Sequence, residues 1–290
     1  MHPVLARVSL SVSQFGLDGR AGYVSRAPEV EVREMLALAQ KSGVFGLDAG
    51  PASPHGEAVI GAVAPRPLGL RLTVKVPRGD RGGDYLETEL RASVMRLGVD
   101  SVDTVMIQAA GDLFAAWGQT MWARLKAIQE TGLFKRIGVS AYASDDPAGL
   151  ARRFRPDVLQ APASLLDQRL LVDGSLNRVR DLGVEVHLRS IFLNGPLFRP
   201  ADKVAPQHRE AAARLSRARR LIAEGRSDPL QAALGFALTR PEADQVVVAA
   251  ATLAELSAIL AAAVSPPPDL DWDDMALDDP DALEPRWAAA

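Results

Sequence analysis

Strand-like and helix-like segments alternate along almost the whole chain, and this alternation limits the possible folds more than any other feature. Short segments rich in aliphatic and β-branched residues are expected to form strands at residues 12–17, 44–48, 72–76, 102–108, 136–140, 158–161, 184–190 and 246–249. The intervening segments with helical spacing are residues 29–41, 57–63, 84–97, 115–131, 147–154, 174–181, 207–224 with 230–238, and 253–263. Glycines follow several of these helices, as left-handed C-terminal caps require.

Strand–helix units in such a series predict a parallel sheet that closes into a (β/α)8 barrel, the TIM-barrel fold. A doubly wound open sheet is the alternative, but it usually has fewer strands, and no GxGxxG motif follows a strand here. We assign residues 1–264 to the barrel and expect an N-terminal β-hairpin, with one strand at residues 4–10. Residues 265–290 are expected to form an acidic C-terminal tail, in which Trp272 and Trp287 indicate contacts with the barrel.

Composition excludes several classes of function. The net charge of −3 argues against general binding to nucleic acid or anionic membranes, which needs a basic surface. The chain has no cysteine, so disulfides, thiol catalysis and cysteine-bound metals are excluded, and no His, Asp and Glu set has metal-ligand spacing. Without a signal-peptide pattern or an apolar run of about 18 residues, we expect a cytoplasmic protein.

The second expected strand ends in a carboxylate, Asp48, followed by a Gly/Pro/Ser turn and a helix near Glu57. In a TIM barrel, the C-terminal ends of the strands carry the catalytic groups. The stretch from Asp48 to Glu57 resembles the aldo-keto reductase signature DTAPxYGxSE without gaps. Four later stretches resemble the same family in the correct order: LRASVMRLGVDSVDTVMIQ, TGLFKRIGVSAY, PDVLQAPASLLDQRL and EVHLRSIFLNGPLF. The resemblance covers nearly the whole chain.

Aldo-keto reductases use an aspartate, a tyrosine that donates a proton, a lysine that lowers the tyrosine pKa, and a histidine that orients the carbonyl. By this resemblance, Asp48 and Lys75 are the aspartate and the lysine. Ser53 and Gln108 stand where the tyrosine and the histidine belong. A general acid accelerates such a reaction by about 10²–10⁴-fold, and a serine hydroxyl is too weak an acid for the lysine to activate. We therefore expect a vestigial catalytic site.

Three side chains elsewhere could replace the lost acid: Tyr23, Tyr142 and His55. Each also has a plain structural explanation as a loop or rim residue. Asp48 and Lys75 could likewise be a structural ion pair, and His187 is expected to be a core histidine with satisfied hydrogen bonds.

The resemblance implies that more of the family's residues are present in the cofactor site than in the catalytic site. The matching positions are Ser140 and Gln160 for the nicotinamide amide, Arg189 for the residue that stacks on the nicotinamide ring, and Ser190, Leu193 and Gly195 for the pyrophosphate segment. The loop after the last strand, residues 249–256, has no lysine or arginine to bind a 2′-phosphate. It offers Thr252 and the negatively charged Glu255, so NAD(H) is expected rather than NADP(H).

A kept nucleotide site beside a lost proton donor predicts an NAD(H)-binding regulatory pseudo-enzyme. This combination resembles a group of oxidoreductase-like bacterial cell-division regulators, which implies FtsZ and a cell-cycle histidine kinase as partners. The terminal alanines, residues 288–290, resemble signals read by the protease ClpXP. The alternatives are an active NAD-dependent reductase or sugar dehydrogenase with a relocated proton donor, and a binding scaffold without nucleotide.

Overall fold

A computed structural model gives the arrangement of the chain, and it describes residues 2–12, 15, 28–49, 54–64, 69–193, 195–198, 209–277 and 279–284. Parallel strands form a closed barrel in chain order, with the last strand paired to the first. The strands are β1 Val8–Ser11, β2 Gly46–Asp48, β3 Arg71–Val76, β4 Val102–Ile107, β5 Phe134–Ser140, β6 Val158–Pro162, β7 Glu185–Arg189 and β8 Gln245–Ala249. The expected TIM barrel is confirmed.

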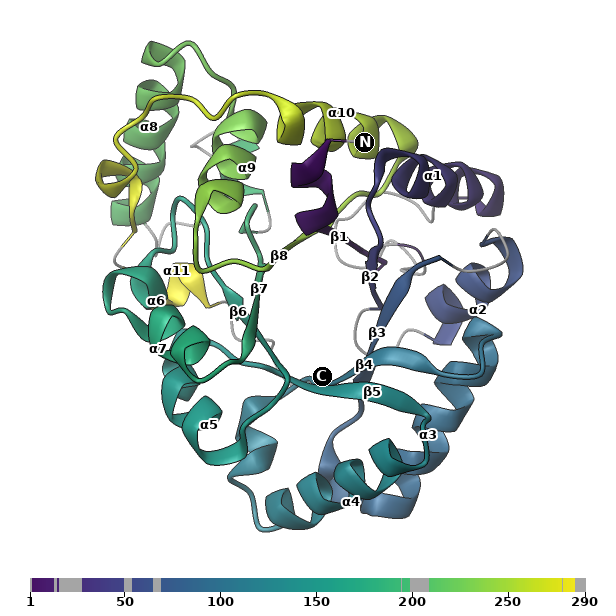
Figure 1. Cartoon of the computed structure of the whole chain (residues 1–290). Helices are drawn as coiled ribbons and strands as arrows, with labels where there is room; N and C mark the ends of the chain where they lie inside the picture. The colour runs from purple at the N-terminus through teal and green to yellow at the C-terminus, as the bar shows by residue number, and fades with distance from the viewer. Residues whose placement is uncertain are drawn as a thin grey trace.

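Helices surround the barrel, as Figure 1 shows. The α-helices are α1 Glu29–Ser42, α2 Pro54–Val63, α3 Gly83–Leu97, α4 Gly118–Glu130, α5 Pro147–Phe154, α6 Arg169–Val172, α7 Ser175–Asp181, α8 Arg209–Glu224, α9 Pro229–Thr239, α10 Leu253–Val264 and α11 Pro280–Leu283. Short 3-10 helices include η1 Pro3–Arg7, η2 Gly79–Arg81, η3 Ala110–Leu113, η4 Ala143–Asp145, η5 Pro196–Phe198 and η8 Asp273–Met275. Gly43 and Gly98 cap α1 and α3 in the left-handed conformation, at φ 96° and 64°.

The N-terminal segment differs from the expected hairpin. Residues 4–7 belong to η1, and residues 8–10 belong to the barrel strand β1. The first barrel strand therefore begins at Val8, four residues before the strand expected at 12–17. The misassignment arose because Ser9 and Ser11 alternate with Val8 and Leu10 like residues of a solvent-exposed strand. In the barrel, however, Ser9 faces the interior, where its hydroxyl donates to Gln245 Oε1 at 2.9 Å.

Polar side chains occupy much of the barrel interior, while aliphatic side chains pack outward beneath the helices. The main apolar cluster includes Val8, Val105, Ile137 and Val186, each on a strand face that alternates with a polar interior position. A Cβ built on Gly46 would lie only 1.9 Å from Ser9 Oγ, so the interior is closely packed at that level. The barrel is therefore a filled polar core rather than a pore.

The acidic C-terminal segment packs against the barrel through residue 284. Figure 1 shows it crossing α9 and α8 before α11 reaches α6. The Trp272 ring packs edge-on against Phe236 at 5.6 Å, and Leu277 N donates to Leu166 O at 2.8 Å. Trp287 lies outside the described residues, and the boundary at 264/265 stays a prediction. None of the helices described is both long and apolar enough to cross a membrane.

Candidate active site

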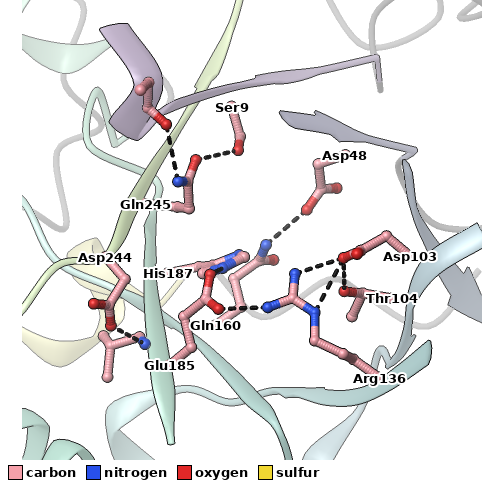
Figure 2. Close-up of polar contacts among 12 residues, drawn as sticks. Ser9, Asp48, Asp103, Thr104, Arg136, Gln160, Glu185, His187, Asp244 and Gln245 are labelled. Carbon is pink, nitrogen blue, oxygen red and sulfur yellow. Dashed lines mark hydrogen bonds and ion pairs between the residues drawn. The ribbon is translucent and has the colours of Figure 1, made fainter. Parts of the chain in front are cut away.

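The expected carboxylate and lysine meet at the C-terminal ends of β2 and β3. Lys75 Nζ lies 3.1 Å from Asp48 Oδ1, and the two side chains are only 9% and 4% exposed. Gln160, on β6, donates from Nε2 to the other carboxylate oxygen, Oδ2, at 2.6 Å, and Figure 2 shows its amide reaching across the barrel interior. The carboxylate is thus held by a cation on one side and an amide on the other, which offsets the cost of burying its charge.

The amide of Gln160 leaves one polar atom unsatisfied. Gln160 is fully buried, and its Oε1 has no hydrogen-bond donor among the described residues. Ser140 is also buried and is the register partner of Gln160 across β5 and β6. The structure therefore brings together the two residues expected to bind a nicotinamide amide, and it leaves the Gln160 oxygen as a buried acceptor.

Arg189, at the end of β7, reaches across β6 toward β5. Its Nη2 donates to Ala141 O at 3.3 Å, its Nη1 donates to Ser190 Oγ at 3.1 Å, and its guanidinium stacks on the Tyr142 ring. Its Nε is buried without an acceptor among the described residues. The sequence indicates separate roles for Arg189 and Tyr142, and in the structure the two side chains are in contact.

Of the two positions that replace the tyrosine and the histidine, the structure describes only Gln108, and no hydrogen bond joins it to this network among the described residues. Gln108 follows β4 and is exposed. Ser53 and Tyr23 lie outside the described residues, so their placement stays a prediction. His55 is exposed in the first turn of α2.

The loop after β7 bends sharply where the resemblance expects it to follow a pyrophosphate. Ser190, Leu193 and Gly195 have φ values of 59°, 45° and 85°. Two of these are non-glycine residues in the left-handed region, a conformation that costs free energy and is common at functional loops. A Cβ on Gly195 would meet only Phe198, at 3.8 Å, so the glycine is needed for its backbone angle rather than for space.

Carboxylates occupy the N-terminal end of α10. Thr252 Oγ1 accepts from Glu255 N at 3.1 Å, and Glu255 Oε2 accepts from Ala251 N at 2.7 Å. Glu31 on α1 accepts from Leu253 N at 2.8 Å. Thr252, expected to bind the cofactor, thus caps the helix, and Glu255, expected beside it, holds the amide of Ala251 just before the cap.

A second polar network links strands at the opposite end of the barrel. Arg136 on β5 pairs with Asp103 on β4 and Glu185 on β7, and Figure 2 shows it between the two carboxylates. Glu185 Oε1 lies 2.8 Å from Nε2 of His187, which confirms the expectation of a satisfied core histidine. The hydrogen bond with His187, together with the charge of Arg136, lowers the pKa of Glu185 to about 2 despite partial burial.

Sequence reasoning missed most of this second network. Arg136, Asp103 and Glu185 come from three strands, and nothing local in the sequence pairs them. The charged residues within otherwise apolar strands do indicate such a network, because buried charges need partners.

Comparisons with known proteins agree with this fold. The Aldo/keto reductase family profile matches residues 16–276. An aldo-keto reductase of Mycolicibacterium vanbaalenii is 32% identical over 147 residues, which are 47% of this chain and 50% of the relative. The match therefore spans about half the length of that curated relative.

Two solved structures share the architecture. The holo form of aldo-keto reductase AKR11C1 from Bacillus halodurans aligns with a TM-score of 0.73 and 17% identity, over 93% of this chain and 89% of that one. PA4992 of Pseudomonas aeruginosa aligns with a TM-score of 0.67 and 16% identity, over 89% of both chains. At these identities the structures support the fold alone. Because the family profile spans most of the chain, the protein belongs to the aldo/keto reductase family.

Proposed function

We propose that this protein binds NAD(H) and acts as a regulatory protein without ordinary reductase activity, in the manner of the cell-division regulator KidO. The observation that carries the proposal is the closed network around Asp48. Lys75 is paired with Asp48, and Gln160 holds the other carboxylate oxygen. The position that would supply a proton to an alkoxide carries Ser53, and the carbonyl-orienting position carries Gln108.

The loss of the proton donor affects a step that carbonyl reduction requires. Hydride transfer to a carbonyl creates an alkoxide, which must be protonated by a nearby acid. Lys75 can lower the pKa of a phenol only when a phenol lies beside it, and the position that carries the family's phenol is Ser53 in this chain. The remaining network orients and neutralises groups, but it transfers no proton to a substrate.

The cofactor assignment rests on the fit of the residues at the barrel mouth. Aldo-keto reductases generally bind NAD(P)H. The unsatisfied Gln160 Oε1 fits the N–H of a carboxamide, which is the polar group of the nicotinamide ring. Ser140 is the second polar residue at this level. When bound, the nicotinamide would supply or accept a hydride, and Gln160 and Ser140 would hold its carboxamide.

Preference for NAD(H) over NADP(H) follows from the charge at the start of α10. Glu31 accepts a hydrogen bond from Leu253 N, the first amide of this helix, and Glu255 accepts one from Ala251 N, just before the helix. A 2′-phosphate approaching the same end would meet two carboxylates, whereas a ribose hydroxyl carries no charge.

The proposed partners come from the sequence resemblance. They are FtsZ and a cell-cycle histidine kinase, and the terminal alanines are proposed to be read by ClpXP. The proposed location is the cytoplasm, where these partners act.

An active NAD-dependent reductase or sugar dehydrogenase is the second candidate. The observation that favours it is the place of Tyr142, directly after β5 at the end of the barrel where Asp48 and Lys75 lie. A substrate bound near Arg189 would come close to this phenol.

Titration with NADH, followed by its fluorescence, tests both candidates. Binding without oxidation of NADH across a panel of aldehydes and sugars supports the regulator. Oxidation that is lost in Tyr142→Phe supports the enzyme. Absence of binding contradicts both and supports the scaffold. The variant Gln160→Leu has a side chain of similar size without the buried acceptor, and it should weaken the binding of NADH by about tenfold.

A further inference from the structure

The carboxylate of Glu284 lies among donors from two other segments of the chain. Ala143 N donates to Oε1 at 3.1 Å, Ser144 Oγ donates to Oε2 at 2.7 Å, and Arg169 Nη2 lies 3.0 Å from Oε1. Ser144 N adds a longer contact of 3.4 Å to Oε1. We call the group formed by Ala143, Ser144 and Arg169 the carboxylate cradle. Hydrogen bonds of this kind are stronger than neutral ones because the acceptor is charged.

The carboxylate cradle is held in shape by contacts that do not involve Glu284. Arg169 is fixed by two parallel bonds to the buried Asp167, both of 2.9 Å. Ala143 and Ser144 belong to η4, whose first turn is closed by Tyr142 N donating to Asp145 Oδ2 at 2.8 Å. The donors are therefore positioned before any carboxylate arrives, which lowers the entropy lost on binding.

An apolar contact accompanies the carboxylate cradle. Leu283, the residue before Glu284, is only 2% exposed. It belongs to a second apolar cluster, separate from the main one, that contains Leu166 beside β6 and Leu193 in the loop after β7. The segment that docks here is thus recognised through an apolar side chain followed directly by a carboxylate.

We propose that the carboxylate cradle and the apolar cluster around Leu283 form a peptide-docking site, and that Leu283–Glu284 is its intramolecular occupant. A partner protein with a segment of the same chemistry, an apolar residue followed by an acid, binds by displacing the chain's own segment. The inference rests on the proposed function in one respect, that the protein acts through protein partners. It does not require nucleotide.

The tether makes the occupant inhibitory. A segment joined to the barrel by a short connection is present at an effective concentration in the millimolar range, so a partner segment must compete with it. The same arrangement links docking to the barrel mouth, because η4 directly follows Tyr142, which stacks on Arg189. Displacement of Glu284 removes a contact from the loop that carries this stack.

A labelled peptide tests the proposal on the full-length protein. The probe is residues 272–284 with fluorescein at the N-terminus and an amide at the C-terminus, so that its last side chain matches Glu284. Fluorescence anisotropy compares the natural chain with Glu284→Gln, whose own segment is weakened. We expect the variant to bind the probe at least about tenfold more tightly. A probe ending in glutamine should bind the variant about tenfold more weakly than the natural probe.

Two results would overturn the proposal: equal probe affinity for the natural chain and Glu284→Gln, or equal affinity of the variant for the two probes. Hydrogen exchange gives an independent reading, because Glu284→Gln should speed exchange at Ala143 and Ser144, and unchanged exchange there contradicts the proposal. NADH titration of the same proteins separates this inference from the proposed function. Peptide docking without NADH binding would refute the nucleotide assignment alone, and NADH binding without docking would refute the peptide site alone.

Discussion

The guanidinium carbon of Arg189 lies 4.3 Å from the centre of the Tyr142 ring. Because β6 lies between β5 and β7, this contact links two strand ends across the strand that carries Gln160. Arg189 also donates to the carbonyl of Ala141, next to Tyr142, at 3.3 Å. The mouth of the barrel is therefore braced on the side where Ser140 and Gln160 lie.

A double-mutant cycle should measure this brace. Tyr142→Leu and Arg189→Met each remove the cation–π contact while keeping most of the side-chain volume. We expect a coupling free energy of about 0.5–1 kcal/mol between them, the range for partly exposed cation–π pairs. Urea denaturation of the two single variants and the double variant gives the value. Strict additivity would mean that the stack contributes nothing to stability.

Lys75→Met should strongly destabilise the protein. It leaves the Asp48 carboxylate buried with the Gln160 amide as its one partner among the described residues, and breaking one side of a buried pair costs about 3–5 kcal/mol. The double variant Asp48→Asn, Lys75→Met should recover part of the loss, because it buries no charge. Arg91→Met is the matched control, since it breaks the exposed Arg91–Glu87 pair on α3 and should cost less than about 1 kcal/mol. Similar losses in Lys75→Met and the control would contradict a buried ion pair.

Acid should unfold the protein partly through Glu185. In the folded state its pKa is about 2, against an ordinary value of 4.5, so the unfolded chain takes up a proton that the folded chain does not. The stabilisation is present above pH 4.5 and is lost as the pH falls toward 2, with a slope of up to ~1.4 kcal/mol per pH unit. Glu185→Gln should flatten the pH dependence of the unfolding free energy in this window. Glu130→Gln, at the exposed end of α4, should leave the dependence unchanged.

NADH should bind at least about tenfold more tightly than NADPH, because one or two charge-assisted bonds to the 2′-phosphate are missing. Isothermal titration with both nucleotides measures the ratio. High salt should narrow the difference in affinity between NADH and NADPH, because it screens the negative charges of Glu31 and Glu255. Glu255→Gln should narrow this difference further. A preference for NADPH would show that a basic residue reaches the site from elsewhere.

Restoring the two lost family residues should leave the fold intact. Gln108 is exposed after β4, so Gln108→His introduces no large side chain into the core, and Ser53 is expected to face the same open barrel mouth. We expect a thermal midpoint within about 2–4 °C of the natural one, equivalent to roughly 1 kcal/mol or less for a chain of this size. Calorimetry measures this midpoint. A larger fall would mean that one of these positions is packed inside the protein.

Most of the barrel was predictable because its outward-facing residues are aliphatic and repeat in every strand. The strands expected at 72–76 and 158–161 agree with β3 and β6 to within one residue. β1 was misplaced because both faces of this strand are buried, one by helices and one by polar partners, and the sequence pattern cannot distinguish buried polar residues from solvated ones.

The candidate site was predictable to the extent that strand ends determine it. Asp48 ends β2, Lys75 lies one residue before the end of β3, and Gln160 lies two residues before the end of β6. In a parallel barrel such positions lie toward one end, where their side chains can meet. The partners of Arg189 and Glu284 were not predictable, because each contact joins segments far apart in the sequence. Their geometry depends on how loops pack after the barrel has closed.

The seam between β1 and β8 has a consequence for synthesis. Arg7 donates to the carbonyls of Leu238, Arg240 and Ala243, and Ser9 donates to Gln245. A chain emerging from the ribosome therefore presents its first strand long before the acceptors for that strand exist. The open edge of β1 must wait for the last part of the barrel, so closure is a late step of biogenesis. Nascent chains halted before residue 245 should be protease-sensitive throughout, and release of the complete chain should protect both ends of the barrel together.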